Sequence, residues 1–341
     1  MSAPATTMRR LKPHAGERPI ALRRLLINRA WWTVCGLGLI LLAVPVLWIL
    51  IAVVGKAVTV FHWSVLTHTT SGVGGYGIAN ALVGTIVLAV GVAIVAGLVG
   101  ISGGIYLAEF GGTGVFSTLL RSASEVLAGI PSIVFGYVGY LTLVIGLGWN
   151  LSTLPGVIVL AMLVVPYVAK ATELALNQVP SAYREGAEAL GMSKPYLLRK
   201  VVFRSAVPGV LTGLIIALAI SVGETAPLLY TAGFTNAYPS FSLIGNHQNS
   251  HPIGYLTYAA YGFIEDPSSV VRNLAYDASM LLIVLVLVLI IASRVLVRIS
   301  QKFAPNRAVA NLSRQDRRKM RELAKGPSTE NATQGVAASG K

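Results

Sequence analysis

Long runs of apolar residues, separated by short polar segments, dominate the pattern of this 341-residue chain. A membrane-spanning helix needs about 20 mainly apolar residues. Six runs meet that requirement, at 31–55, 80–107, 119–147, 155–176, 208–231 and 274–298. The weak ten-residue alternation that is typical of an outer-membrane β-barrel is missing. The pattern therefore predicts an all-α polytopic membrane protein with six transmembrane helices.

The composition supports this fold class. Hydrophobic residues make up 54% of the chain and charged residues only 12%, whereas a soluble domain carries about 25% charged residues. The single cysteine, Cys35, lies inside the first apolar run. A lone cysteine excludes a disulfide framework.

The net charge of +14 is unevenly distributed. Positive residues precede the first run, follow the sixth and fill the connection at 177–207, whereas the connections on the other side contain only Lys56 and Arg272. Because positive residues favour the cytoplasmic side, both termini and the 177–207 loop are predicted to be cytoplasmic. The partner expected for these basic segments is then the lipid bilayer, and no nucleic acid is expected. Residues 1–30 are predicted to be a basic cytoplasmic N-terminus and residues 301–341 a disordered basic tail near anionic headgroups.

The cytoplasmic segment 179–209 is too long for a simple connection. Pro180 suits the edge of a first helical turn, Ser181 suits a cap, and Gly191 suits a helix stop in the left-handed conformation. These signals predict a short helix over 181–190, followed by a second helix that starts near Ser193. Tyr183, Ala187 and Leu190 fall on one face of the short helix, beside a strip of small residues at Ala182, Gly186 and Ala189. This helix is suited to docking in a groove of another protein; the alternative is an amphipathic helix on the bilayer surface.

Three charged residues lie deep within apolar runs: Lys170, Glu173 and Glu224. Such residues are expensive in lipid and usually face a protein interior or an aqueous path. Lys170 and Glu173 are three residues apart and are expected to pair. A rise of about 1.5 Å per residue places Lys170 and Glu224 at different heights, which favours a ladder of charges along one path. The alternative is that each charge ties its helix to a neighbour. Arg121 and Glu125 are interpreted as a surface pair on the third helix.

Glycine and proline interrupt two of the runs. Pro131, beside Ser132, breaks the third run, and Gly223 and Pro227 flank Glu224 in the fifth. Proline removes a helical hydrogen bond, and free backbone groups at membrane depth are tolerated where they line a wet cavity. The breaks therefore favour a translocation path, although a harmless kink has the same sequence. Pairs of glycines four residues apart also predict close helix packing; these are Gly100 with Gly104, and Gly209 with Gly213.

The sequence Glu185-Gly186-Ala187, with Gly191 after three intervening residues, resembles the EAA loop of type I ABC importer permeases. Four further segments are similar to the phosphate-specific ABC transporter permease, A-type subunit: "GETAPLLYTA" (223–232), "GIPSIVFGYVGY" (129–140), "GGIYLAEF" (103–110) and "KATELALNQVPSAYREGAEALG" (170–191). The resemblance covers about residues 72–300. The chain departs from the family at Gly186, at Arg204 where proline is usual, and at the uncharged positions 219–222.

The resemblance implies a type I ABC importer permease fold, with a first transmembrane helix at 31–55 and the permease domain at 72–300. It implies uptake of inorganic phosphate across a bacterial inner membrane. The implied partners are a second homologous permease, an ATPase dimer and an extracytoplasmic phosphate-binding protein. The sequence contains no G-x-x-x-x-G-K-[ST] phosphate-binding loop. ATP is therefore expected to be used by the partner ATPase, with no cofactor bound by this chain.

The resemblance of the loop, together with the buried charges and helix breaks, suggests roles for residues. The ATPase-coupling residues are Tyr183, Arg184, Glu185, Gly186, Ala187, Leu190 and Gly191. The translocation path is assigned to Ser132, Lys170, Thr172, Glu173, Ser221, Glu224 and Thr225, with helix breaks at Pro131, Gly223 and Pro227. Lys170 and the hydroxyl groups would meet the passing anion, whereas Glu224 would serve gating or pair with a partner's cation.

Other functions remain open at this point. A permease for another oxyanion would have the same features. An ion-driven secondary transporter would need no ATPase. A membrane enzyme is the third alternative, because His247 and His251 are four residues apart; "HQNSH" lacks the intervening glutamate of a metalloprotease motif. No metal site or catalytic residue is predicted.

Overall fold

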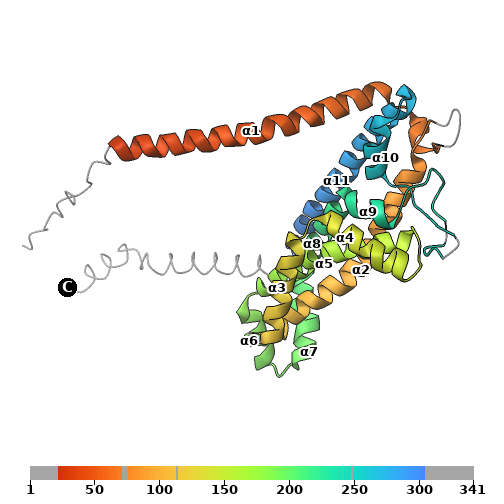
Figure 1. Cartoon of the computed structure of the whole chain (residues 1–341). Helices are drawn as coiled ribbons and strands as arrows, with labels where there is room; N and C mark the ends of the chain where they lie inside the picture. The colour runs from red at the N-terminus through yellow and green to blue at the C-terminus, as the bar shows by residue number, and fades with distance from the viewer. Residues whose placement is uncertain (1–21, 71–75, 113, 241, 247–248, 304–341) are drawn as a thin grey trace, which may run out of the picture. The chain divides into compact units, whose positions relative to one another are not determined.

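The computed structural model describes residues 22–70, 76–112, 114–240, 242–246 and 249–303. Most of the predicted terminal segments, and His247, lie outside the described residues. The chain divides into two compact units, 1–59 and 60–341, which are described separately. The described part is built from helices (Figure 1), as predicted.

The described part of the first unit is α1, which begins at Leu22 and continues to Val60, the first residue of the second unit. The helix is longer than the predicted 31–55 span and contains Pro45. Its tryptophans are exposed, with Trp31 at 65% and Trp48 at 74%. A single apolar helix has no core of its own to bury these rings, and such a surface suits lipid or another apolar helix.

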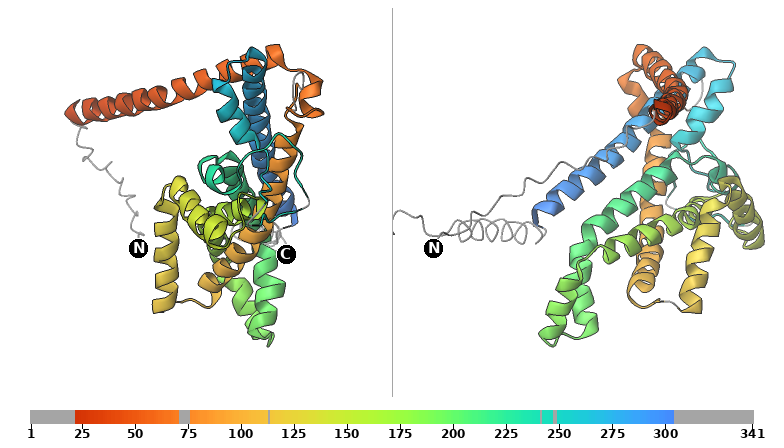
Figure 2. Two further views of the ribbon diagram at one scale, coloured as in Figure 1. Left: turned by 45° about the vertical axis from the view of Figure 1, so that its right-hand side comes forward. Right: turned by 90° about the vertical axis from the view of Figure 1, so that its left-hand side faces the viewer.

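Helix α5 (Thr153–Asn177) is the centre of the second unit. It packs against α2 (Ala79–Glu109) on one side and α8 (Phe203–Gly223) on another, as the two views of Figure 2 show. Glycines permit these close approaches. A β-carbon on Gly104 would lie 2.5 Å from the carbonyl oxygen of Ala169, and one on Gly209 would lie 2.7 Å from the β-carbon of Ala175. The packing predicted from the glycine pairs is confirmed.

The third apolar run is not one helix. It forms α3 (Val115–Gly129), an extended step at Ile130–Pro131, α4 (Ser132–Gly139) and the π-helical turn η2 (Tyr140–Gly146). The two halves are bent by 100°. The described residues therefore contain five helices that are long and apolar enough to cross a membrane, or six spans if this bent pair counts as one.

The fifth run is also interrupted. The span begins earlier than predicted, at α7 (Lys194–Leu197), continues through η3 (Leu198–Val202), and ends with α8 at Gly223. Glu224 has an extended backbone, and α9 (Ala226–Thr231) then begins. Pro227 lies in the first turn of α9, where its missing N–H is harmless. The expectation that Pro227 removes a hydrogen bond within a continuous helix is wrong, because the helix ends before it.

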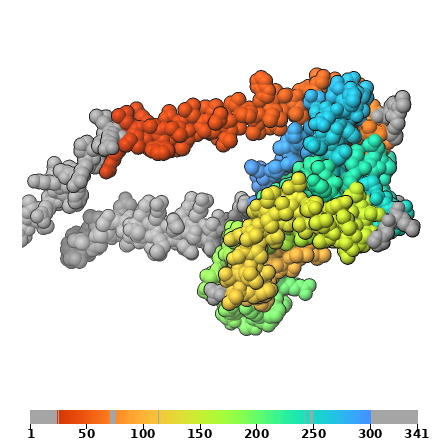
Figure 3. Space-filling view, viewed as in Figure 1, coloured from red at the N-terminus to blue at the C-terminus, as the bar shows by residue number. Residues whose placement is uncertain are grey.

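Two further groups of short elements lie at opposite ends of the second unit. Helices α6 (Ser181–Ala189) and α7 form the lower end in Figure 1. The upper end is built from η1 (Trp63–Leu66), α10 (Leu256–Gly262), η4 (Phe263–Glu265) and the start of α11 (Ser269–Phe303), around a core that includes Val65, Leu256 and Leu274. In the space-filling view (Figure 3), yellow α3 forms part of the face turned to the viewer, above the green atoms of the lower end.

Candidate functional site

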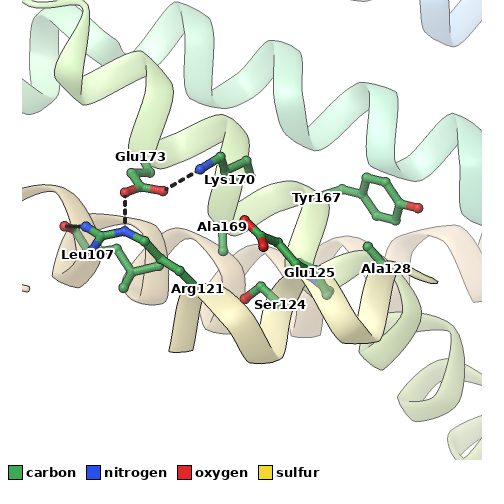
Figure 4. A pocket seen from close by; sticks show the side chains of 10 residues that line it. Leu107, Arg121, Ser124, Glu125, Ala128, Tyr167, Ala169, Lys170 and Glu173 are labelled. Atoms are coloured by element: carbon green, nitrogen blue, oxygen red, sulfur yellow. Dashed lines mark hydrogen bonds and ion pairs between the residues drawn. The ribbon is translucent and has the colours of Figure 1, made fainter. Parts of the chain in front are cut away.

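A cavity of about 200 Å³ separates α3 from α5. Its walls combine apolar side chains with four charged ones (Figure 4), and the lining residues are Leu107, Arg121, Ser124, Glu125, Ala128, Pro166, Tyr167, Ala169, Lys170 and Glu173. Arg121 Nε donates to Glu173 Oε1 at 2.9 Å, and Lys170 Nζ donates to Glu173 Oε2 at 3.3 Å. One carboxylate is therefore shared by two cations.

Burial explains this sharing. Only 7% of the Glu173 side chain is exposed, against 32% for Arg121 and 56% for Lys170. A buried carboxylate is stable only when it is paired and hydrogen-bonded. The predicted pairing of Lys170 with Glu173 is confirmed. The predicted surface pair of Arg121 with Glu125 is wrong, because Arg121 turns toward α5 and the buried acid.

A second cavity of about 140 Å³ continues from the first. Ala128 and Tyr167 line both cavities. The second is lined by Leu127, Ala128, Ile130, Ser132, Leu163, Tyr167, Ile220 and Glu224. Lys170 and Glu224 thus line different, adjoining cavities and are not paired with each other, as the difference in height predicted.

Both helix breaks border this second cavity. Ser132 begins α4 directly after the extended Pro131, and Glu224 follows the last residue of α8. The Thr257 hydroxyl donates to the Glu224 carbonyl at 3.2 Å, so α10 holds the second break in place. Backbone polar groups that leave their helices can be satisfied beside a wet cavity. The breaks therefore turn a stretch of apolar helix into a polar wall.

Three of the predicted path residues line neither of the two cavities. Thr172 is fully buried, donates to the Val168 carbonyl at 2.8 Å and packs against Gly104 of α2. Ser221 is buried and donates to the Leu218 carbonyl at 2.9 Å. Thr225 is half-buried, and its carbonyl oxygen accepts hydrogen bonds from the first turn of α9. These residues serve packing and helix ends in the described structure.

A bidentate ion pair fixes α6 to the rest of the unit. Arg184 donates to both carboxylate oxygens of Glu109, at 2.8 and 2.7 Å, and to the Leu176 carbonyl at 3.2 Å. Only 6% of the Glu109 side chain is exposed. The hydrogen bond to Glu109 raises the pKa of Arg184 above its ordinary value. Sequence reasoning missed Glu109, whose position in "LAEF" at the end of α2 gives no sign of a partner 75 residues away.

The faces of α6 differ from the prediction in one residue. Ala187 is buried and Tyr183 is half-buried, both in a small core beneath α6, whereas Leu190 is 77% exposed. Leu190 follows the last residue of α6, and Gly191 then adopts a positive φ of 71°, as expected for the helix stop. Glu185 and Gly186 are exposed. The strip of small residues faces outward with them.

Residues 100–304 match the family described as binding-protein-dependent transport system inner membrane component. The match covers more than half of the chain, which defines the protein as a multi-pass permease component of that class. The chain is 50% identical over 286 residues to the phosphate transport system permease protein PstA 2 of Mycobacterium bovis, covering 84% of this chain and 93% of the relative. It is 35% identical over 252 residues to PstA of Yersinia pestis, covering 73% and 83%. The chain belongs to the PstA family of phosphate transport system permeases.

Solved structures show the same fold. Two crystal forms of the MetNI methionine ABC transporter, in inward-facing conformations, align with TM-scores of 0.50 and 0.51. Each shares 18% sequence identity and covers 65% of this chain and 95% of the other. The predicted importer permease fold is confirmed.

Proposed function

We propose that this chain is the permease subunit of an ATP-driven importer of inorganic phosphate, and that it forms half of the translocation path. The 50% identity to PstA 2 over most of both chains is the observation that carries the proposal. The partners are a second homologous permease, an ATPase dimer and an extracytoplasmic phosphate-binding protein. ATP is bound and hydrolysed by the ATPase, and this chain binds no cofactor.

The two adjoining cavities supply the path through this chain. Lys170 gives the anion a point charge, and Ser132 and Tyr167 offer hydroxyl donors along the walls. Glu224 repels an anion and therefore serves as a gate or pairs with a cation of the second permease. Selectivity resides in the binding protein, because a tight site in the membrane would slow release.

Helix α6 transmits the work of the ATPase. Its exposed Glu185 and Gly186 dock into the ATPase, while Tyr183, Arg184 and Ala187 fasten the helix to the membrane domain. ATP binding shifts the population between outward-open and inward-open states. The docking surface and the fastening surface are therefore different faces of one short helix.

The test uses the complete complex in liposomes, with phosphate uptake and ATPase activity measured together. Glu185→Lys is expected to reduce phosphate-stimulated ATPase activity to its unstimulated level, because the docking contact is lost. Glu265→Lys, at another exposed acid at the opposite end of the unit, is the matched control. Unchanged stimulation in Glu185→Lys would eliminate the coupling role.

Two further outcomes separate the alternatives. Uptake of another oxyanion in preference to phosphate would move the proposal to a different substrate. Accumulation of phosphate by the isolated chain without ATP, driven by an ion gradient, would replace the importer with a secondary transporter. Affinity purification in gentle detergent is expected to recover an ATPase and a second permease with this chain.

A further inference from the structure

Arg121 joins three elements at the end of the unit that carries α6. Besides its bond to Glu173 on α5, its Nη2 donates to the Leu107 carbonyl at 3.0 Å and its Nη1 to the Gly112 carbonyl at 3.2 Å. Leu107 lies in the last turn of α2, where helical carbonyls have no partner further along the helix. Arg121 therefore closes the seam between α3 and α5 and fastens both to the end of α2.

Helix α6 is bonded to the same turn of α2. Glu109, which Arg184 holds with two hydrogen bonds, is two residues from Leu107. A chain of contacts thus runs from α6 to the end of α2, then to Arg121, and then to Glu173 in the cavity wall. Four side chains, Arg184, Glu109, Arg121 and Glu173, thus connect α6 with the cavity wall.

Glu125 offers Arg121 a second partner. It lines the same cavity and follows Arg121 by four residues on α3, a spacing that brings two side chains within reach. Within the described part of the chain, the Glu125 carboxylate makes no hydrogen bond or ion pair, and the residue is exposed. An arginine that precedes its glutamate is the weaker orientation of such a pair, which accounts for the preference for Glu173 in the described state.

We propose that Arg121 is a latch that exchanges Glu173 for Glu125 when the path opens at this end; the proposal rests on the proposed function. The exchange leaves Glu173 paired with Lys170 and Arg121 paired on its own helix. No buried charge is left without a partner, which is the expensive outcome for ion pairs in a protein interior. The α3–α5 seam can then separate in response to α6. Arg121 is a positioning residue, since it acts through Glu173 and the helix ends.

The decisive variant is Glu125→Gln in the complete complex with the ATPase, the second permease and the binding protein in liposomes. The latch predicts that phosphate turnover and stimulated ATPase activity both fall about twofold, because the open state loses one ion pair between residues four apart on a helix. The KM for the loaded binding protein is expected to stay unchanged. A purely structural role of Arg121 predicts no effect, because the Glu125 carboxylate makes no hydrogen bond or ion pair in the described residues. Glu265→Gln is the matched control and is expected to behave as the unmodified complex.

Arg121→Gln tests the other side of the exchange. The seam loses its latch, so ATPase activity without binding protein is expected to rise severalfold and phosphate moved per ATP to fall. Glu125→Gln is expected to add nothing in the Arg121→Gln background, since the two residues act as a pair. Full turnover in Glu125→Gln, or additive effects of the two substitutions, would overturn the latch. If the unmodified complex moves no phosphate, the proposed function fails, and the latch is still decided by the ATPase rates of the same variants.

Discussion

Gly136 of α4 lies directly against Pro227 of α9. A β-carbon on Gly136 would stand 2.6 Å from the Pro227 α-carbon. The two interrupted spans therefore touch where each has just restarted as a helix, four residues beyond Ser132 and three beyond Glu224. The contact fixes the distance between the two breaks that border the second cavity.

Gly136→Ala is expected to destabilise the permease by about 1–3 kcal/mol, because backbone rather than a flexible side chain opposes the added methyl group. The midpoint of thermal unfolding of the purified complex should fall. Phosphate uptake should fall with it, since the breaks are pushed apart. Gly129→Ala is the matched control: it lies in the same interrupted span, and a β-carbon there meets nothing within 4 Å. Equal midpoints for the two variants would contradict the contact.

Much of the fold follows from the sequence because membrane helices obey a simple length and composition rule. The break at Pro131 and the helix stop at Gly191 are both visible as local chemistry. The predicted span of 208–231 differs from the structure because apolar residues continue past Gly223 and Glu224 into α9. Hydropathy does not register a change in backbone direction when the flanking residues stay apolar.

The site was less accessible to sequence reasoning. The Lys170–Glu173 pair lies on one helix, and spacing reveals it. The pairs of Arg121 with Glu173 and Arg184 with Glu109 join different helices, 52 and 75 residues apart. Only the packing of α2, α3, α5 and α6 brings them together. Spacing on α3 instead suggested Glu125, which is the alternative partner in the latch.

The Arg184–Glu109 clamp predicts a defect in coupling. Arg184→Gln should lower the phosphate moved per ATP severalfold, because truncating one partner of a bonded, largely buried pair leaves the other charge uncompensated. Arg184→Lys keeps the charge but loses the fork that binds both oxygens, and an intermediate ratio is expected. The ratio is measured from simultaneous phosphate and ADP release in liposomes.

Arg204→Gln removes an exposed arginine from the same predicted cytoplasmic region and serves as the control. A ratio in Arg184→Gln that equals that of the control would show that α6 works without the clamp.

The environment of Tyr76 predicts that the protein loses stability at alkaline pH. Burial, and then the neighbouring Asp277, raise the pKa of Tyr76 to about 12; its hydroxyl lies 3.2 Å from Asp277 Oδ2. A raised pKa means that the folded state favours the neutral phenol. The contribution of Tyr76 to stability is complete below a pH of about 10, which is the pKa of tyrosine in the unfolded chain. It is lost as the pH rises toward 12.

Tyr76→Phe should therefore lower stability by about 1 kcal/mol at pH 8, through the lost hydrogen bond. It should also remove one late-titrating phenol from the absorbance change at 295 nm. Tyr261→Phe, at a residue that is 62% exposed, is the matched control and should leave that late absorbance change in place. Identical titration curves for the two variants would contradict the buried contact.

Two substitutions of Lys170, one to Gln and one to Arg, are expected to differ in their effect on phosphate uptake. Its Nζ reaches Glu173 at 3.3 Å while more than half of its side chain is exposed along the first cavity. Lys170→Gln should reduce phosphate uptake about 10- to 100-fold, the range expected when a charged hydrogen-bond donor to an anion is removed. Lys170→Arg should retain most uptake, because the guanidinium keeps the charge and can bind an oxyanion with two donors. Uptake and ATPase activity are compared at saturating loaded binding protein. If the path meets the anion at this residue, uptake recovers with charge alone. If Lys170 serves only to neutralise Glu173, the double variant Lys170→Gln, Glu173→Gln should restore uptake, and that restoration would remove Lys170 from the path.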